Sequence, residues 1–87
     1  MEKSVYRDEN LILSRLLRQC RVDSGLTQGQ FAEALNRPQS FVSDIERGSR
    51  RLDLVQLRDI CDVLGVGLVE FVQRFESEAS RSRVEPQ

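Results

Sequence analysis

The chain has 87 residues, enough for one compact domain and too few for two. It is 39% hydrophobic and 31% charged, as in a globular protein, and no apolar run approaches the roughly 20 residues that a membrane span needs. The net charge of −1 argues against a protein that coats nucleic acid through bulk positive charge. The polar N-terminal start is unlike a signal peptide, so we expect a cytoplasmic location and no membrane partner.

The first predicted helix covers residues 8–24. Asp8 and Glu9 are acids suited to the positive end of a helix, and Gly25 is a natural stop. Its apolar residues recur at i, i+3, i+4 and i+7, which places them on one face: Leu13, Leu16, Leu17 and Cys20.

Two short helices joined by a tight turn are predicted next. Thr27 opens the first, and Gln30 completes a capping box in which each side chain binds the backbone amide of the other residue. Asn36, which tolerates left-handed backbone angles, ends this helix, and Pro38 marks the first turn of the following one. A connection of about three residues forces the two helices to cross steeply, so a helix-turn-helix is predicted over 27–47.

Two further helices complete a predicted all-α fold of five short helices. Asp53 and Gln56 resemble a second capping arrangement at the start of the fourth helix. The fifth is predicted over 67–75. Residues 77–87 lack apolar spacing and are predicted to form a disordered tail, so the single domain is predicted over 1–76. The apolar stripe predicted for the fourth helix is Leu54, Leu57, Cys61 and Leu64.

The two cysteines, Cys20 and Cys61, are the only thiols, and the sequence contains no histidine. Two cysteines without histidine cannot supply the four ligands of a zinc site within one chain, so we expect no metal and no cofactor. Each cysteine falls on the apolar side of a predicted helix, which indicates a small buried hydrophobic residue. A disulfide is the alternative, although a cytosolic protein usually keeps its thiols reduced.

The segment LTQGQFAEALNRPQSFVSDIERG, residues 26–48, resembles the DNA-binding domain of the lambda-repressor and Cro-like (XRE) helix-turn-helix family. The likeness continues through SRRLDLVQLRDICDVLG, residues 49–65. The Leu-Thr-Gln start, the apolar positions and the Ile-Glu-Arg-Gly end all fall at the family's spacing. The resemblance implies a lambda-repressor-like fold whose third helix reads the major groove of double-stranded DNA.

The outward face of the third helix carries short or planar polar side chains that suit a groove about 12 Å wide. Glutamine can pair with adenine, serine can donate or accept, and aspartate can accept from the cytosine amino group. The resemblance implies base contacts at these positions; the alternative is an ordinary solvated helix surface. A carboxylate is repelled by phosphates, so the aspartate can also act by excluding wrong sequences. The predicted base contacts are Gln39, Ser40, Ser43 and Asp44.

Contacts with DNA phosphates are predicted on both sides of that helix. Gln28 lies in the first turn of the second helix, where free backbone amides favour an anion; simple capping polarity is the alternative. Between residues 36 and 51, four arginines oppose only Asp44 and Glu46, which gives a local positive surplus. These four predicted phosphate contacts are Arg37, Arg47, Arg50 and Arg51.

The resemblance also implies a structural ion pair between Arg21 and Glu46, which ties the first helix to the third. Two residues depart from the family pattern. Asn36 stands where glycine is usual, and Phe41 adds a bulky aromatic side chain to the third helix. We expect Phe41 to pack on the fourth helix; stacking on the DNA side is the alternative.

The fifth helix is richer in apolar residues than packing within one chain requires. One recognition helix reads only a few base pairs, and family members usually dimerise to bind two half-sites about one helical turn apart. The sequence therefore predicts a homodimer; the alternative is a monomer whose last helix caps the core. The predicted dimerisation residues are Leu68, Val69, Val72 and Phe75.

The leading functional prediction is a sequence-specific transcriptional regulator that represses by occupying a palindromic operator. A standalone regulator, a restriction-system controller protein and an antitoxin all remain open. A second class is a protein-interaction module that binds a toxin or another regulator with weak or no DNA binding, which the net acidity and Asp44 favour slightly. No enzymatic activity is expected, because the sequence has no histidine, glycine-rich phosphate loop or nucleophile–base pair at recognisable spacing.

Overall fold

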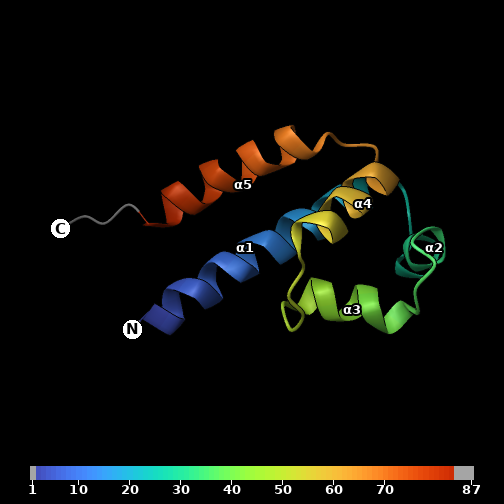
Figure 1. Ribbon diagram of the computed structural model, residues 1–87, viewed down its shortest axis with the longest axis horizontal. Coiled ribbons are helices and arrows are strands. Elements are labelled where there is room, and N and C mark those ends of the chain that lie inside the picture. Colours follow the sequence, from blue (N-terminus) through green and yellow to red (C-terminus); the bar gives the residue numbers. More distant parts are fainter. Residues whose placement is uncertain (1, 84–87) are drawn as a thin grey trace.

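The computed structural model describes residues 2–83, with the side chains of residues 9–81, and this part of the chain is folded into helices without strands. The predicted all-α architecture is confirmed. α1 and α5 lie side by side and extend toward the end of the molecule where both termini lie, while α2 and α3 form the opposite end (Figure 1). Over the described residues, no helix is long and apolar enough to cross a membrane. The helices are α1 (Glu2–Asp23), α2 (Gln28–Ala34), α3 (Gln39–Arg47), α4 (Leu54–Leu64) and α5 (Leu68–Arg83).

One hydrophobic core takes side chains from all five helices. Both predicted buried cysteines belong to it, and both are free thiols. Burial of each large apolar side chain contributes about 1.5–3 kcal/mol to the stability of the fold. The buried faces of α2 and α3 therefore hold these two helices against the rest of the core. The core consists of Leu17, Cys20, Phe31, Ala32, Phe41, Val42, Ile45, Ile60, Cys61, Leu64 and Phe71.

The predicted helix boundaries in the middle of the chain are confirmed by their capping contacts. Thr27 Oγ1 accepts from the Gln30 amide at 3.0 Å, and Gln30 Oε1 accepts from the Thr27 amide at 2.9 Å. Asp53 makes the same reciprocal capping box with Gln56 at the start of α4. Asn36 has a φ of +59°, so it ends α2 in the left-handed region as predicted.

Both ends of the chain are more helical than predicted. α1 begins at Glu2 and not at residue 8, and α5 continues to Arg83. The prediction of a disordered tail from residue 77 is therefore wrong for residues 77–83; residues 84–87 lie outside the described part. Ala79, two turns beyond Phe71, is only 2% exposed, because the second half of α5 packs along α1.

The apolar stripe of α4 also differs from the prediction. Leu54 is 67% exposed, and Ile60 replaces it in the core at 1% exposed. Leu54 is the first residue of α4, and its side chain at this end of the helix lies outside the core.

Candidate nucleic-acid interface

The turn between α2 and α3 presents α3 with one inward and one outward face. Pro38 is the N-cap of α3, one residue outside the helix and not in its first turn as predicted, with extended backbone angles. Phe41, Val42 and Ile45 form the buried face. Phe41 is buried, as expected, since it is only 6% exposed and belongs to the core, whereas its packing on α4 in particular stays a prediction.

The four predicted base-reading residues share the outward face of α3. Gln39 and Ser40 are exposed, and Ser43 and Asp44 are half-buried at its sides. These side chains come from consecutive turns of one helix, so a single groove could receive all of them. Their arrangement suits readout of base edges, which need donors and acceptors on a narrow convex surface.

Gln28, the first residue of α2, connects this face to the interior. Its Nε2 donates to Glu46 Oε1 at 3.0 Å. Its Oε1 accepts from Ser43 Oγ at 3.2 Å and, over a longer 3.4 Å, from Gln39 Nε2. These contacts were not predicted, because no local sequence rule links Gln28 to Gln39 or Ser43 across the turn.

The ion pair between Arg21 and Glu46 implied by the resemblance is present. Arg21 Nε donates to Glu46 Oε2 at 2.6 Å, and Nη2 donates to Oε1 at 3.0 Å, with the two side chains only 11% and 5% exposed. Arg21 also donates to the carbonyl of Leu26, the residue before the Thr27 cap. This bidentate pair therefore joins α1, α3 and the start of α2.

The pKa values of the pair move in the directions expected for an ion pair. Burial alone would raise the pKa of Glu46, but hydrogen bonds from Arg21 and Gln28, together with the charges of Arg21 and Arg18, outweigh it and lower that pKa. The hydrogen bond to Glu46 raises the pKa of Arg21 against the opposing effect of desolvation. Glu46 is therefore a neutralised carboxylate that adds no free negative charge to the α3 surface.

The four predicted phosphate-binding arginines have different environments. Arg47 pairs with Asp44 one turn earlier, so the free protein neutralises the carboxylate that would repel phosphates. An exposed pair of this kind contributes about 0–1 kcal/mol and can open when a ligand binds. Arg37 and Arg50 lie over the ring of Phe41, and Arg51 is exposed beside them in the α3–α4 loop.

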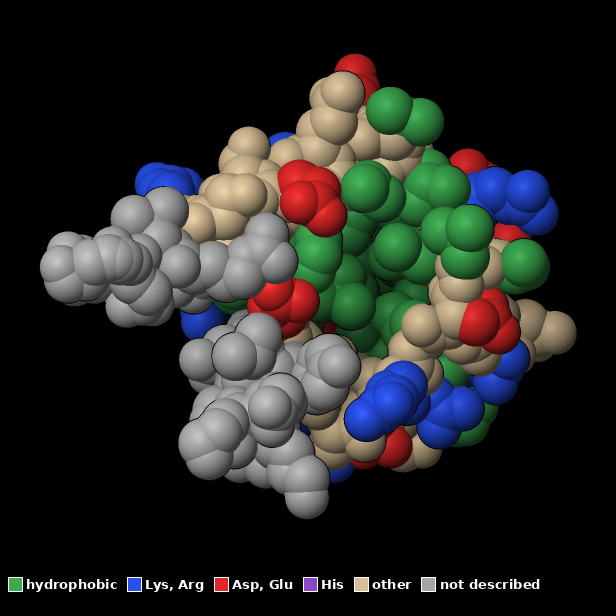
Figure 2. Space-filling model, turned by 60° about the vertical axis from the view of Figure 1, so that its left-hand side comes forward, with side chains coloured by type: hydrophobic (Ala, Val, Ile, Leu, Met, Phe, Trp, Pro, Cys, Tyr) green, Lys and Arg blue, Asp and Glu red, His purple; other side chains and the backbone are tan. Residues whose placement is uncertain are grey.

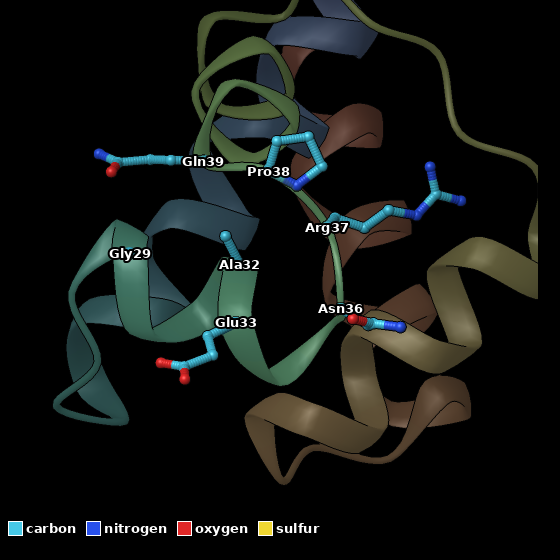
Figure 3. A pocket seen from close by; sticks show the side chains of 7 residues that line it. All are labelled: Gly29, Ala32, Glu33, Asn36, Arg37, Pro38 and Gln39. Atoms are coloured by element: carbon cyan, nitrogen blue, oxygen red, sulfur yellow. The ribbon is translucent and has the colours of Figure 1, made fainter.

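An open hollow lies between α2 and the start of α3, lined by Gly29, Ala32, Glu33, Asn36, Arg37, Pro38 and Gln39. Figure 3 shows that Gln39 and Arg37 point in opposite directions from the chain at Pro38. The Gln39 side faces Gln28, and the Arg37 side faces Phe41. The two flanks of α3 are thus chemically different, one with amides and hydroxyls and the other with guanidinium groups.

The C-terminal end of α3 is fixed by α1 through a contact with Asn10 that the sequence analysis did not predict. Gly48 caps α3 with a φ of +78°, and its carbonyl accepts from Asn10 Nδ2 at 2.7 Å. A Cβ at this position would lie 3.0 Å from Leu11 Cδ2 and 3.3 Å from Ser14 Oγ. The left-handed backbone favours glycine here, and the approach of α1 leaves little room for a Cβ.

The predicted dimerisation residues divide into two groups. Leu68 and Phe75 are half-buried, and Leu68 packs against the core, whereas Val69 is 71% exposed and Val72 36%. Leu54 and Val55 at the start of α4 are exposed as well, which the sequence analysis missed. Figure 2 shows hydrophobic side chains gathered in a hollowed patch on one face of the molecule, with charged side chains of both signs at its rim.

The described residues hold no cluster of histidine, cysteine or carboxylate side chains that could bind a metal ion. Burial raises the pKa of the Cys61 thiol to about 11, with smaller contributions from Cys20 and Asp62. At neutral pH Cys61 is therefore protonated, and thiols in that state are poor nucleophiles and poor metal ligands.

A helix-turn-helix whose second helix has a polar outward face is the fold of a class of DNA-binding regulators. The chain belongs to this class: the family model described as a helix-turn-helix domain matches residues 12–72. Within it, the chain is of the XRE type. It is 34% identical to an XRE-family-like protein from Pseudomonas syringae pv. tomato str. DC3000, with a TM-score of 0.81 over 88% of this chain and 94% of the other.

Two other solved structures are similar. The restriction-modification controller protein C.Esp1396I, solved as a tetramer in complex with its natural 35 base-pair operator, is 30% identical, with a TM-score of 0.74 over 82% of this chain and 93% of the other. The clp gene regulator ClgR from C. glutamicum is 26% identical, with a TM-score of 0.73 over 79% and 88%. No curated protein matched the sequence.

Proposed function

We propose that the protein is a transcriptional repressor that binds a palindromic operator in double-stranded DNA as a homodimer. The observation that carries this proposal is the outward face of α3, where four polar side chains stand clear of the core and two of them are hydrogen-bonded to Gln28. We assign contacts with base edges to these four side chains: Gln39, Ser40, Ser43 and Asp44. We expect such a protein in the cytoplasm, where it has direct access to DNA.

Phosphate contacts fix the register of the helix in the groove and supply most of the affinity. We assign this role to Gln28 beside the N-terminus of α2 and to the arginines around α3. Three of the arginines, unlike Arg47, have no ion pair among the described residues, so their charges are available to DNA. These three are Arg37, Arg50 and Arg51.

Dimerisation places two copies of α3 on successive turns of DNA. The exposed Val69 and Val72 of α5 support a two-fold contact between copies. An apolar patch such as the one in Figure 2 is typical of an interface. C.Esp1396I, which binds its operator as a tetramer, is a precedent for an oligomer of this fold on DNA. A dimer that occupies a promoter would repress by blocking polymerase.

The proposal is tested by selecting bound sequences from random duplex DNA and measuring affinities of the selected duplex over a series of salt concentrations. We expect a two-fold symmetric motif that is lost in the double variant Gln39→Ala, Ser40→Ala. Arg81→Ala, in the distal half of α5, is a matched surface control that should leave the motif unchanged. Recovery of no motif, with weak binding that vanishes near physiological salt, would contradict the proposal.

A protein-interaction module is the second candidate function. The exposed Leu54 and Val55 favour it, because they present apolar surface beside the core without a partner in the fold. Such a module would bind another polypeptide, such as a toxin, with weak or no DNA binding. Co-purification of a distinct polypeptide that the double variant Leu54→Ser, Val55→Ser no longer retains would support it, whereas tight, salt-sensitive DNA binding would argue against it.

A further inference from the structure

Phe41 has an unusual environment for a core residue. It is the third residue of α3 and only 6% exposed, yet two guanidinium groups lie over its ring. The Cζ atoms of Arg37 and Arg50 are each 4.7 Å from the ring centroid. One arginine precedes α3 in the chain and the other follows it, so a single side chain of α3 brings the two connecting segments together.

The two arginines form a concentrated positive charge. Because both Cζ atoms lie 4.7 Å from the same ring centroid, the distance between them is at most twice that length. Both residues are exposed, and neither has an ion pair within the described part of the chain. Two cations at one ring repel each other, and the negative face of the ring attracts each of them. An anion placed against both would offset their repulsion.

The position of this pair complements that of Gln28. On one flank of α3, Gln28 reaches Gln39 and Ser43 from the N-terminal end of α2. Arg37 leaves the chain on the other side, opposite to Gln39 (Figure 3). A helix lying in the major groove has a phosphate backbone along each of its flanks. Gln28 and the arginine pair are therefore placed to meet different strands.

We propose that Phe41 is a positioning residue whose ring holds Arg37 and Arg50 as one preformed phosphate-binding pair on the flank of α3 opposite Gln28. This rests on the proposed function, in which α3 enters the major groove. Free arginine side chains lose rotamer freedom when they bind. The ring orders both guanidinium groups beforehand, so less of this entropy is lost when they contact DNA.

The salt dependence of DNA binding tests the proposal, because each phosphate contact adds about 0.9 to the slope of log K against log salt. Phe41→Leu keeps an apolar side chain but removes the aromatic face. We expect it to lower the slope by up to about 0.9, the contribution of one phosphate held by the pair, with a loss of roughly tenfold in affinity at low salt. Phe41→Tyr keeps the ring and should retain the wild-type slope.

Phe31→Leu is the matched control. Phe31 is 1% exposed in the same core, on the other helix of the helix-turn-helix, and no guanidinium of the described residues lies over its ring. It should lower thermal stability without changing the slope. An unchanged slope in folded Phe41→Leu, with stability lowered as in the control, would show that Phe41 is core packing alone and overturn the proposal.

A second measurement does not depend on the stability of the Phe41 variants. Arg37→Gln, Arg50→Gln and their double variant are compared on a mixed-sequence duplex, which reports phosphate contacts without base readout. If the arginines act as one site, the double variant loses less affinity than the two single losses combined; independent losses would contradict the pair. Failure of the wild type itself to bind any duplex would instead refute the proposed function.

Discussion

Gln28 makes contacts of two kinds, one with the buried ion pair and one with the outward face of α3. Its amide is held by Glu46, and its carbonyl oxygen accepts from Ser43 and Gln39. Glu46 is itself held by both nitrogens of the Arg21 fork. The orientation of two of the proposed base-reading side chains, Gln39 and Ser43, thus depends through Gln28 on a buried salt bridge. Side chains ordered before binding lose less entropy on binding.

Arg21→Ala is expected to lower the free energy of unfolding by about 3–5 kcal/mol, because it leaves the Glu46 carboxylate buried without its partner. It also removes the hydrogen bond to Leu26. Denaturant unfolding measures the loss, and Arg18→Ala is the control, since Arg18 is exposed and acts on Glu46 only through its charge. An unchanged melting temperature for Arg21→Ala would contradict this assignment.

The lowered pKa of Glu46 gives the ion pair a defined pH dependence. A carboxyl group with a lower pKa in the folded state contributes stability that is fully present above its unfolded pKa, ordinarily 4.5, and is lost as the pH falls through the folded value. The stability difference between wild type and Glu46→Gln should therefore be largest at pH 7 and shrink below pH 4.5. Urea unfolding of both proteins at pH 7, 4 and 3 measures it; a constant difference would be inconsistent with the lowered pKa.

At the scale of elements, α3 is positioned from both ends. α2 holds its N-terminal half through the tight turn at Asn36 and the Gln28 hydrogen bonds. α1 holds its C-terminal end, where Asn10 donates to the carbonyl of Gly48 and a Cβ at Gly48 would crowd Leu11 and Ser14. The placement of α3 relative to DNA consequently depends on a glycine that makes no proposed DNA contact.

Gly48→Ala is expected to destabilise the fold more than Gly65→Ala does. Both positions have left-handed backbones, with φ of +78° and +74°, so alanine costs about 1–2 kcal/mol at each. A Cβ at Gly48 would also crowd Leu11 and Ser14, whereas one at Gly65 meets nothing within 4 Å. Overpacking of this kind adds about 1–3 kcal/mol. If denaturant unfolding shows equal losses of stability for the two variants, α1 moves aside without cost, which would contradict this prediction.

At the scale of the whole molecule, α1 and α5 extend together beyond the helix-turn-helix (Figure 1), and one face of the molecule carries an apolar patch (Figure 2). Ala79 is buried where the distal half of α5 packs along α1. The same helix turns Val69 outward. α5 thus has two faces, one that completes the fold and one that is available to a second copy.

Val69→Asp is expected to shift the proposed dimer to monomer without unfolding it, because Val69 is 71% exposed and a carboxylate there would be desolvated only in the interface. Sedimentation velocity measures the assembly state, and a circular-dichroism melt checks the fold. Val22→Asp, on exposed surface of α1, should leave the assembly unchanged. If Val69→Asp still forms dimers, the dimer interface does not include Val69.

Much of the central fold could be predicted because its signals are local. The capping boxes at Thr27 and Asp53 need only a side chain and an amide three residues away, and Asn36 and Gly65 end helices through their own backbone preferences. The outward polar face of α3 follows from helical periodicity alone. The pair of Arg21 and Glu46 came from family resemblance, because no local rule links residues 25 apart.

Contacts between distant segments could not be predicted in the same way. The sequence after residue 76 contains too few apolar residues to specify a helix, yet α5 continues to Arg83 because α1 lies alongside it. Helical spacing was compatible with either an inward or a DNA-facing Phe41, and its burial beneath two arginines depends on how α3 and the loops around it pack. Side-chain chemistry within a few residues determines where helices begin and end. Burial depends on neighbouring side chains that only the complete fold brings together.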